Sequence, residues 1–250
     1  MATENEHNES QKCFLDWMKL QEQDLGELLQ VINQSEKPPD TVLTQLAEKS
    51  IQHFQDYIQK RSHLYQNNVS HYFAPGWNSA LENSFLWLAG CRPSIFIRLV
   101  YALCGSEVES NLAEYLQGAR IGNLGELSAR QLNMVNNLHS RTIKQEEKLS
   151  SQLASLQEEI ADEPISILAK SQSQASDEPS DEVDRALQDL DVAMARILQE
   201  ADNFRLSTVK ELNSILNPIQ AIDFLAAAKK LHLCMHDWGK RRDLNHGRKN

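Results

Sequence analysis

The sequence is poor in residues that interrupt helices. It contains 9 glycines and 7 prolines among 250 residues, and most of the glycines fall between Gly76 and Gly125. Leu, Ala, Gln and Glu, which favour helix, are frequent. No segment alternates apolar and polar residues between hairpin turns, as a β-strand would. We therefore expect an all-α protein whose chain breaks are concentrated in the middle.

Several other features that the sequence lacks exclude whole classes of protein function. With 25 Lys and Arg against 35 Asp and Glu, the formal net charge is −10, so direct binding to the nucleic-acid backbone is not expected. No apolar run approaches the roughly 20 residues of a membrane span, and the polar N-terminus does not resemble a signal peptide. The 4 cysteines are scattered, which indicates reduced thiols. Because GxSxG, P-loop, GxGxxG and HExxH motifs do not occur, we expect no enzyme.

Apolar residues recur every three or four positions in several segments, which is the spacing of amphipathic helices. We expect a single multi-helix bundle, an ordered domain over residues 12–242, with a disordered N-terminus at 1–11 and a mobile basic tail at 243–250. Two long helices are joined by a flexible acidic loop at 166–182. The expected helices cover residues 10–34, 40–58, 78–90, 94–105, 128–162, 183–216 and 219–242.

The first long helix has a polar centre. His139, Thr142 and Glu146 lie on the same face as its apolar seam, and a buried Glu must be paired or protonated. These residues either form a buried network or face solvent. The apolar seams of the two long helices either pack within the chain or mediate a homodimer.

A family resemblance enters at PGWNSALENSFLWLAGCRPSIFIRLVYALCG. This segment resembles the core motif of the Delay of Germination domain, in which a Trp precedes a Leu-Trp pair, a Gly and an Arg-Pro-Ser sequence. The opening FLDWMKLQEQDLGELL resembles the first helix of this family, and EADNFRLSTVKELNSILNPIQAIDFLAAAKKLHLCMHDWG resembles its final helix pair. The segment QLNMVNNLHSRTIKQEEKLSSQLASLQEE resembles a long helix that also occurs in the C-terminal domain of TGA-class bZIP transcription factors. The resemblance covers roughly residues 13–242. The matching motif positions are Trp77, Leu86, Trp87, Gly90, Arg92, Pro93 and Ser94.

The resemblance implies a non-catalytic plant adaptor in seed dormancy, germination and abscisic-acid signalling that binds type 2C protein phosphatases. The alternative is a transcriptional co-regulator that pairs with TGA-type factors. Those factors carry a basic region and a zipper before this domain, whereas residues 1–10 here contain no Lys or Arg. We therefore expect no DNA reader, and a location in the nucleus, the cytoplasm or both.

His232 and His236 are the candidate cofactor ligands. Proteins of the Delay of Germination type have been linked to haem through C-terminal histidines, and these two resemble them. Their four-residue spacing places them on one helical face, so they cannot occupy opposite sides of one haem. Because neutral imidazole is the ligating form, we expect haem binding to weaken below about pH 6.5. The alternative is two histidines that pack at a helix end.

Trp77, Trp87, Arg92 and Tyr101 form the densest aromatic and basic group. They either pack around a helix corner or line a groove for a partner or an apolar ligand. TGA relatives are associated with fatty-acyl and co-activator binding, so the resemblance also implies a sensor of haem or a fatty acid.

Overall fold

A computed structural model describes residues 4–34, 36, 38–105, 124, 127–161, 166–167 and 181–247. Within these ranges the chain is helical, and the only β-type pairing is an isolated bridge between Trp87 and Gly90. The all-α prediction is confirmed. The α-helices are α1 (Glu4–Ile32), α2 (Asp40–Tyr65), α3 (Ser70–Phe73), α4 (Ala80–Ser84), α5 (Ser94–Leu103), α7 (Ala129–Glu158), α9 (Asp181–Ile215) and α10 (Pro218–Asn245), and a 3-10 turn, η2 (Glu159–Ala161), follows α7.

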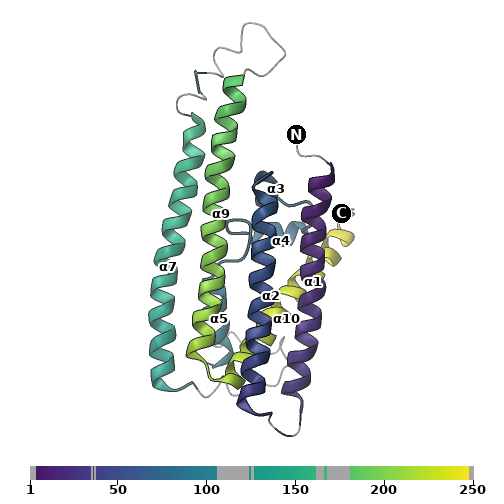
Figure 1. Ribbon diagram of the computed structural model, residues 1–250, viewed down its shortest axis with the longest axis vertical. Helices are drawn as coiled ribbons and strands as arrows, with labels where there is room; N and C mark the ends of the chain where they lie inside the picture. Colours follow the sequence, from purple (N-terminus) through teal and green to yellow (C-terminus); the bar gives the residue numbers. More distant parts are fainter. Residues whose placement is uncertain are drawn as a thin grey trace.

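The long helices run along the long axis of an elongated bundle (Figure 1). Helices α7 and α9 lie side by side, and one end of this pair projects beyond the rest of the bundle. Helix α10 packs against α1 and α2 and also contacts α4 and α5. Helix α10 contributes more buried residues to the main core than any other described helix, and they are Ala221, Ile222, Phe224, Leu225, Ala226 and Ala227.

The junction between α9 and α10 is fixed to the start of α7. Asn217 caps α10 by accepting a hydrogen bond from the Gln220 N–H, and Pro218 occupies the first turn, where a missing N–H costs nothing. Gln131, in the first turn of α7, donates to Ile215 O at 3.0 Å and to Gln220 Oε1 at 2.7 Å. Ser128 forms an equivalent capping box with Gln131. One glutamine thus ties together the ends of three helices.

Both ends of the bundle are more ordered than expected. Helix α1 begins at Glu4, within the segment 1–11 that we expected to be disordered, and buried Ser10 accepts a hydrogen bond from Tyr72 at 3.0 Å. At the other end, α10 continues to Asn245. Asp243, which we had assigned to the mobile tail, is buried and accepts a hydrogen bond from the Ala80 N–H at 2.9 Å. These tertiary contacts extend the helices beyond their apolar periodicity.

Two further helix boundaries, at the end of α4 and the start of α9, differ from those expected from the sequence. Helix α4 ends at Ser84 instead of continuing to Gly90, and α9 begins at Asp181, two residues before the expected start. Most of the acidic loop at 166–182 lies outside the described residues. The shortening of α4 has a specific cause, described below.

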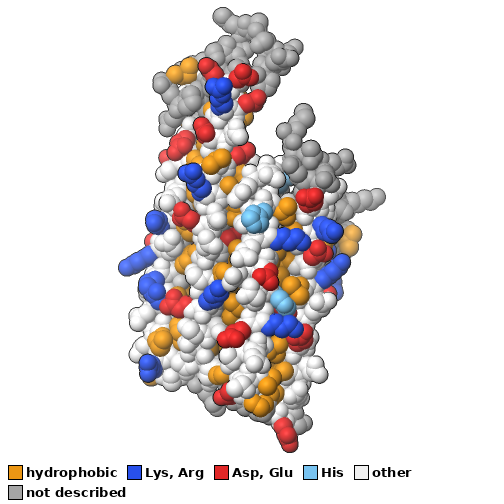
Figure 2. Space-filling view, viewed as in Figure 1, with side chains coloured by type: hydrophobic (Ala, Val, Ile, Leu, Met, Phe, Trp, Pro, Cys, Tyr) orange, Lys and Arg blue, Asp and Glu red, His pale blue; other side chains and the backbone are white. Residues whose placement is uncertain are grey.

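The described surface carries mixed charge. Figure 2 shows acidic and basic side chains interspersed over the face in view, with apolar side chains between them. None of the described helices combines the length and apolar character that a membrane crossing requires.

Asp223 is a buried carboxyl group in α10. It is 6% exposed, and no described group forms a hydrogen bond with its Oδ2. Burial raises the pKa of Asp223 to about 6, because the charged form is poorly solvated. An acid with a raised pKa favours the folded state below its unfolded pKa, and this contribution is lost as the pH rises through the folded pKa.

We predict that Asp223→Asn stabilises the protein at pH 7.5, where the wild-type carboxyl is ionised. The melting temperature should rise by about 2–6 °C, which corresponds to roughly 1–2 kcal/mol for a chain of this size. The difference should vanish near pH 4, where Asp223 is protonated. Asp237→Asn, on the exposed side of the same helix, is the matched control. An equal effect of the two variants at pH 7.5 would contradict the assignment.

Candidate functional site

The segment that follows α4 has an unusual backbone. We refer to residues 85–93 as the motif loop. Leu88 and Ala89 adopt φ angles of 46° and 57°, in the left-handed region that residues other than glycine rarely occupy. Trp87 and Gly90 exchange backbone hydrogen bonds of 2.7 and 3.1 Å across this turn. Because two consecutive left-handed residues are strained, interactions from elsewhere in the fold must hold the loop in place.

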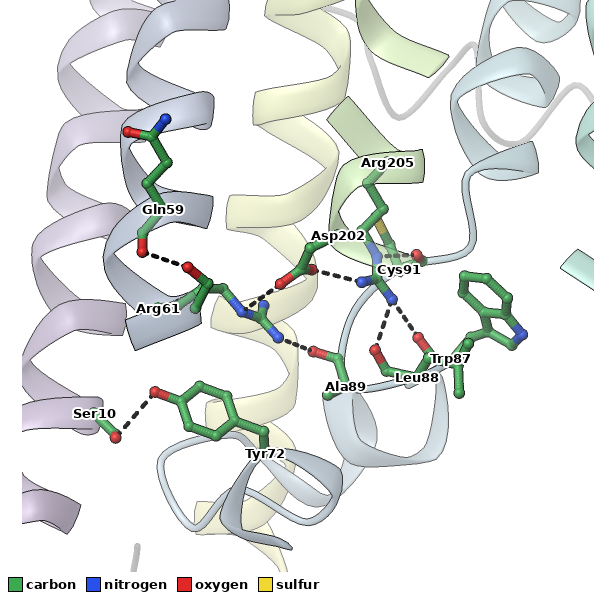
Figure 3. Close-up of polar contacts among 11 residues, drawn as sticks. Ser10, Gln59, Arg61, Tyr72, Trp87, Leu88, Ala89, Cys91, Asp202 and Arg205 are labelled. Atoms are coloured by element: carbon green, nitrogen blue, oxygen red, sulfur yellow. Dashed lines mark hydrogen bonds and ion pairs between the residues drawn. The ribbon is translucent and has the colours of Figure 1, made fainter. Parts of the chain in front are cut away.

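Two buried arginines hold the loop by its carbonyl oxygens (Figure 3). Arg205 of α9 donates from Nε to Cys91 O at 2.7 Å and from Nη2 to the carbonyls of Trp87 and Leu88. Arg61 of α2 donates from Nη2 to Ala89 O at 3.0 Å. The turn therefore points its carbonyls inward at two guanidinium groups, which explains why α4 cannot continue as a helix.

Asp202 links the two arginines. Its Oδ1 accepts from Arg205 Nη1 at 2.7 Å, and its Oδ2 lies 3.1 Å from Arg61 Nε. All three side chains are buried. Burial by itself lowers the pKa of Arg61, but the negative charge of Asp202 and the smaller contributions of the neighbouring tyrosines together raise it above its ordinary value. Two buried cations share one anion, and the loop carbonyls supply the remaining electrostatic compensation.

Gly90 is required by this arrangement. A Cβ at position 90 would lie 2.7 Å from Arg205 Cζ, closer than two such atoms can approach. The glycine of the motif therefore makes room for a guanidinium group. The sequence had suggested that a helix ends at Gly90, but α4 ends at Ser84 and Gly90 lies in the motif loop.

Glu146 holds the other side of the motif loop. This α7 residue is buried, and its carboxylate accepts hydrogen bonds from the Ser94 N–H at 2.7 Å and from Ser94 Oγ at 3.1 Å. Arg92 Nε lies 3.6 Å from Glu146 Oε2. An acidic group at a helix N-terminus satisfies its free N–H groups, so Glu146 caps α5. The three polar residues of this helix do not form one network: Glu146 is buried and bonded to Ser94, Thr142 is buried and its hydroxyl has no hydrogen-bond partner among the described residues, and His139 is half-buried against Tyr101.

A second polar cluster joins α4 to α10. His236 Nδ1 lies 2.8 Å from Glu82 Oε1, and Ser79 Oγ donates to Glu82 Oε2 at 2.6 Å. Burial acts to raise the pKa of Glu82, but the hydrogen bonds from His236 and Ser79 bring it below its ordinary value. A Cβ at Gly239 would lie 1.9 Å from Ser79 Oγ, so only glycine allows α10 to approach this closely.

A cavity of about 440 Å³ lies between these clusters. Its volume is within the range of small-molecule sites in proteins. Side chains from α1, α2, α3, α4, α5, α9 and α10, from the segment between α3 and α4, and from the motif loop line it. The aromatic residues of the wall are Phe14, Trp17, Phe54, Tyr57, Tyr72, Trp77, Phe85, Phe96 and Phe224.

The two histidines have different surroundings. His232 lines the cavity, and its Nδ1 lies 2.8 Å from Gln21 Nε2. Burial lowers the pKa of His232 to about 4, so its imidazole is neutral at physiological pH. His236 is bonded to Glu82, packs edge-on against Phe14 at 5.6 Å and does not line the cavity. A neutral imidazole in an aromatic cavity is the kind of side chain that haem iron takes as a ligand, and of the two histidines only His232 would be in a position to hold a group in this cavity.

The four residues of the expected groove do not come together. Trp87 and Arg92 are adjacent, with Arg92 Cζ 5.9 Å from the Trp87 ring, and Trp87 Nε1 donates to Ser150 Oγ at 2.9 Å. Trp77 is buried in the cavity wall beside Tyr72. Tyr101 lies apart, where its hydroxyl donates to Asn136 Oδ1 at 2.6 Å.

The sequence analysis did not single out Arg61, Asp202 or Arg205. The sequence did contain a signal for the two α9 residues, because both lie within an apolar stripe at helical spacing. The stripe consists of Leu198, Asp202, Arg205, Val209 and Leu212. Charged residues inside an apolar stripe indicate buried, paired charges.

We predict that Asp202→Ala lowers the free energy of unfolding by about 3–5 kcal/mol, because it leaves two buried guanidinium groups without their anion. Urea denaturation monitored by circular dichroism measures this loss. Asp189→Ala, at an exposed position of the same helix, should change it by less than about 0.5 kcal/mol. A loss as small in Asp202→Ala as in the control would show that the ion pairs do not support the loop.

Comparison with known proteins places this motif in a family. Residues 24–102 match a family described as DOG1, seed dormancy control. The chain is 41% identical to the Arabidopsis thaliana protein DOG1-like 1 over 93% of its own length and 89% of that protein. It is 38% identical to DOG1-like 3 of the same plant, covering 92% and 84% of the two chains. It is also 25% identical to the Arabidopsis transcription factor TGA6 over 90% of this chain and 59% of that protein. The chain therefore belongs to the DOG1 family of plant seed-dormancy regulators.

Proposed function

We propose that this protein is a non-catalytic adaptor in seed dormancy and abscisic-acid signalling that acts by binding type 2C protein phosphatases. The observation that carries the proposal is the motif loop. Three buried charged side chains are used to hold a strained turn, and this turn places Phe85, Cys91 and Arg92 at the surface. Exposed side chains on a rigidly held loop are typical of recognition sites.

The second polar cluster supports an adaptor over an enzyme. Ser79 and His236 both bond to the carboxylate of Glu82. In a catalytic triad the histidine lies between the serine and the acid, so that it can remove the hydroxyl proton. Here the acid lies between them and serves as part of a capping box. The described residues also contain no cluster of three His, Cys, Asp or Glu side chains suited to a metal ion.

A transcriptional co-regulator is the alternative adaptor function. The similarity to TGA6 over 90% of the chain favours it. The 3-10 turn η2 after α7 and the start of α9 offer the exposed residues Ile160 and Leu187 as contacts for a TGA-type factor or a second copy of this chain. Either adaptor function places the protein in the nucleus, the cytoplasm or both.

We predict that the purified chain retains a type 2C phosphatase from imbibed-seed extract and inhibits that phosphatase when the two are mixed. Mass spectrometry of the retained proteins and a phosphopeptide hydrolysis assay measure the two effects. A serine/threonine phosphatase of another class should be unaffected. Retention of a TGA-type factor without any type 2C phosphatase would replace the first function with the co-regulator.

A haem sensor is a second candidate function, favoured by the neutral His232 in the cavity wall. Haem would supply a redox- and gas-sensitive iron, and His232 would bind it while the aromatic wall excludes water. An apolar acyl chain would fit the same wall and make no use of His232.

We predict that haemin added to the protein gives a Soret shift that His232→Ala abolishes and His236→Ala only weakens. Because the pKa of His232 is lowered to about 4, the shift should persist at pH 5, where an ordinary histidine is protonated. This revises the pH limit of about 6.5 expected from the sequence. Equal spectra of wild type and His232→Ala would rule out ligation by this residue.

A further inference from the structure

One buried arginine in the cavity wall has more hydrogen-bond donors than there are acceptors around it. Arg61 carries five N–H groups, and only 7% of its surface is exposed. Its Nη2 donates to Ala89 O at 3.0 Å, and its Nε lies 3.1 Å from Asp202 Oδ2 without the alignment of a hydrogen bond (Figure 3). The hydroxyl of Tyr57 also interacts with the guanidinium group. These acceptors leave donors of Arg61 without a partner among the described residues.

The unused donors of Arg61 border the cavity. Its Nε is closed off from water. Its Nη1 makes no aligned hydrogen bond with a described residue either, but this atom is not among those closed off, and Arg61 lines the cavity. The wall residue Tyr57 places a second polar group beside it. A polar group that enters the cavity can therefore reach Arg61.

The charges around Arg61 do not balance. Arg61 and Arg205 are both cations of the cavity wall, and Asp202 is the anion that they share. Two further charged residues of the wall, Lys229 and Glu82, each form a hydrogen bond to a side chain outside it. One positive charge beside Asp202 is thus left without a described anion. A ligand with a single negative charge would compensate it.

A row of stacked aromatic rings leads along the wall to Arg61. Trp17 stacks on Tyr57 with 4.7 Å between ring centroids and 8° between the ring planes, and Phe54 packs on Trp17 at 5.7 Å. The guanidinium carbon of Arg61 lies 5.7 Å from the ring centre of Tyr57 and 5.3 Å from that of Tyr72. All of these residues line the cavity. The wall therefore offers flat apolar faces next to a cation.

The cavity is open to solvent beside the motif loop. Phe85 and Ile95 line it and are nevertheless 63% and 38% exposed. Side chains that both line a cavity and face water mark its mouth, so a small molecule can enter without unfolding of the bundle. The volume of about 440 Å³ is ample for a small fused-ring molecule.

We propose that the cavity binds a flat aromatic carboxylic acid in its ionised form. The carboxylate accepts hydrogen bonds from Arg61 Nη1 and from the Tyr57 hydroxyl, which can accept one hydrogen bond while donating another. The ring system lies against the row that Trp17 and Tyr57 form, where offset stacking is favourable. This inference goes beyond the adaptor and haem functions, since it requires neither a phosphatase nor a ligand at His232.

Charge and shape favour such an acid over other occupants of an apolar cavity. A neutral aromatic molecule would leave the positive charge beside Asp202 uncompensated, and a buried charge without a partner is costly. An unbranched acyl acid would supply the negative charge, but its chain cannot stack on the flat ring faces. The three kinds of ligand can therefore be distinguished by their affinities.

The test uses the full chain and isothermal titration calorimetry with three probes. Naphthalene-2-carboxylate has the proposed charge and shape, naphthalene-2-carboxamide has the shape alone, and nonanoate has the charge on a flexible chain. We expect the naphthalene carboxylate to bind about tenfold more tightly than its amide, because hydrogen bonds to a charged group are the stronger ones. It should also bind roughly fivefold more tightly than nonanoate, because only the ring stacks.

Variants of α2 locate the carboxylate on the protein. Tyr57→Phe should weaken binding of the naphthalene carboxylate about tenfold and leave the amide and the melting temperature unchanged. Arg61→Gln should abolish the preference for the acid over the amide, and this ratio of affinities is independent of any loss of stability in the folded variant. Tyr65→Phe is the matched control and should bind like wild type. The Tyr65 hydroxyl is buried on the same helix without a hydrogen-bond partner among the described residues, and Tyr65 does not line the cavity.

Four results would overturn the proposed site. They are equal affinities for the acid and the amide, no binding of any probe, an equal loss in Tyr65→Phe and Tyr57→Phe, and nonanoate binding as tight as that of the naphthalene carboxylate, which would replace the aromatic acid with an acyl acid. His232→Ala should bind the acid like wild type, and a tenfold loss there would move the ligand to the candidate haem site. Retention of a phosphatase from seed extract is measured without these probes, so the adaptor function and the acid site can fail independently.

Discussion

The fold depends on one aspartate shared between two buried arginines. Asp202 connects Arg61 on α2 with Arg205 on α9, and the guanidinium groups in turn hold four carbonyls of the motif loop. Buried ion pairs add little to stability compared with apolar residues of equal size, but they are costly to break. Here the charges specify a conformation. An apolar substitute for either arginine could fill the space, but it would offer no donors to the left-handed turn.

How far the sequence predicts this fold differs from element to element. The long helices follow from apolar spacing, and the break at Asn217-Pro218 follows from local chemistry, so α7, α9 and α10 were located to within a few residues. The end of helix α4 was placed six residues too late, because the segment SALENSFLWLAG favours helix by local propensity up to Gly90. Its early end is caused by Arg61 and Arg205, which are distant in sequence. Glu146 shows the intermediate case, since its position on an apolar seam left a buried network and a solvent-facing side chain as alternatives, and only tertiary packing brings it to Ser94.

The candidate site was less predictable for the same reason. Its cavity is lined from position 10 to position 235, and no periodicity within one helix reveals that such residues converge. The four-residue spacing of His232 and His236 places them on successive turns of α10. Only tertiary packing distinguishes the two histidines. Gln21 and the cavity wall surround His232, whereas His236 is bonded to Glu82. The motif residues Trp77 and Trp87 and the nearby Tyr101 are close in sequence but contact three different partners, namely Tyr72, Ser150 and Asn136.

The central position of α10 has a consequence for the order in which the protein can fold during synthesis. Helices α1 and α2 leave the ribosome first, yet the helix that both pack against is made last. Until α10 emerges, Leu28 and Leu43, which are completely buried in the finished protein, have no surface of α10 to cover them. Contacts between the two ends of a chain form slowly, and apolar faces that wait for them are prone to aggregate. A nascent chain of this protein therefore exposes these apolar faces for longer than a bundle of similar size built from successive helix pairs.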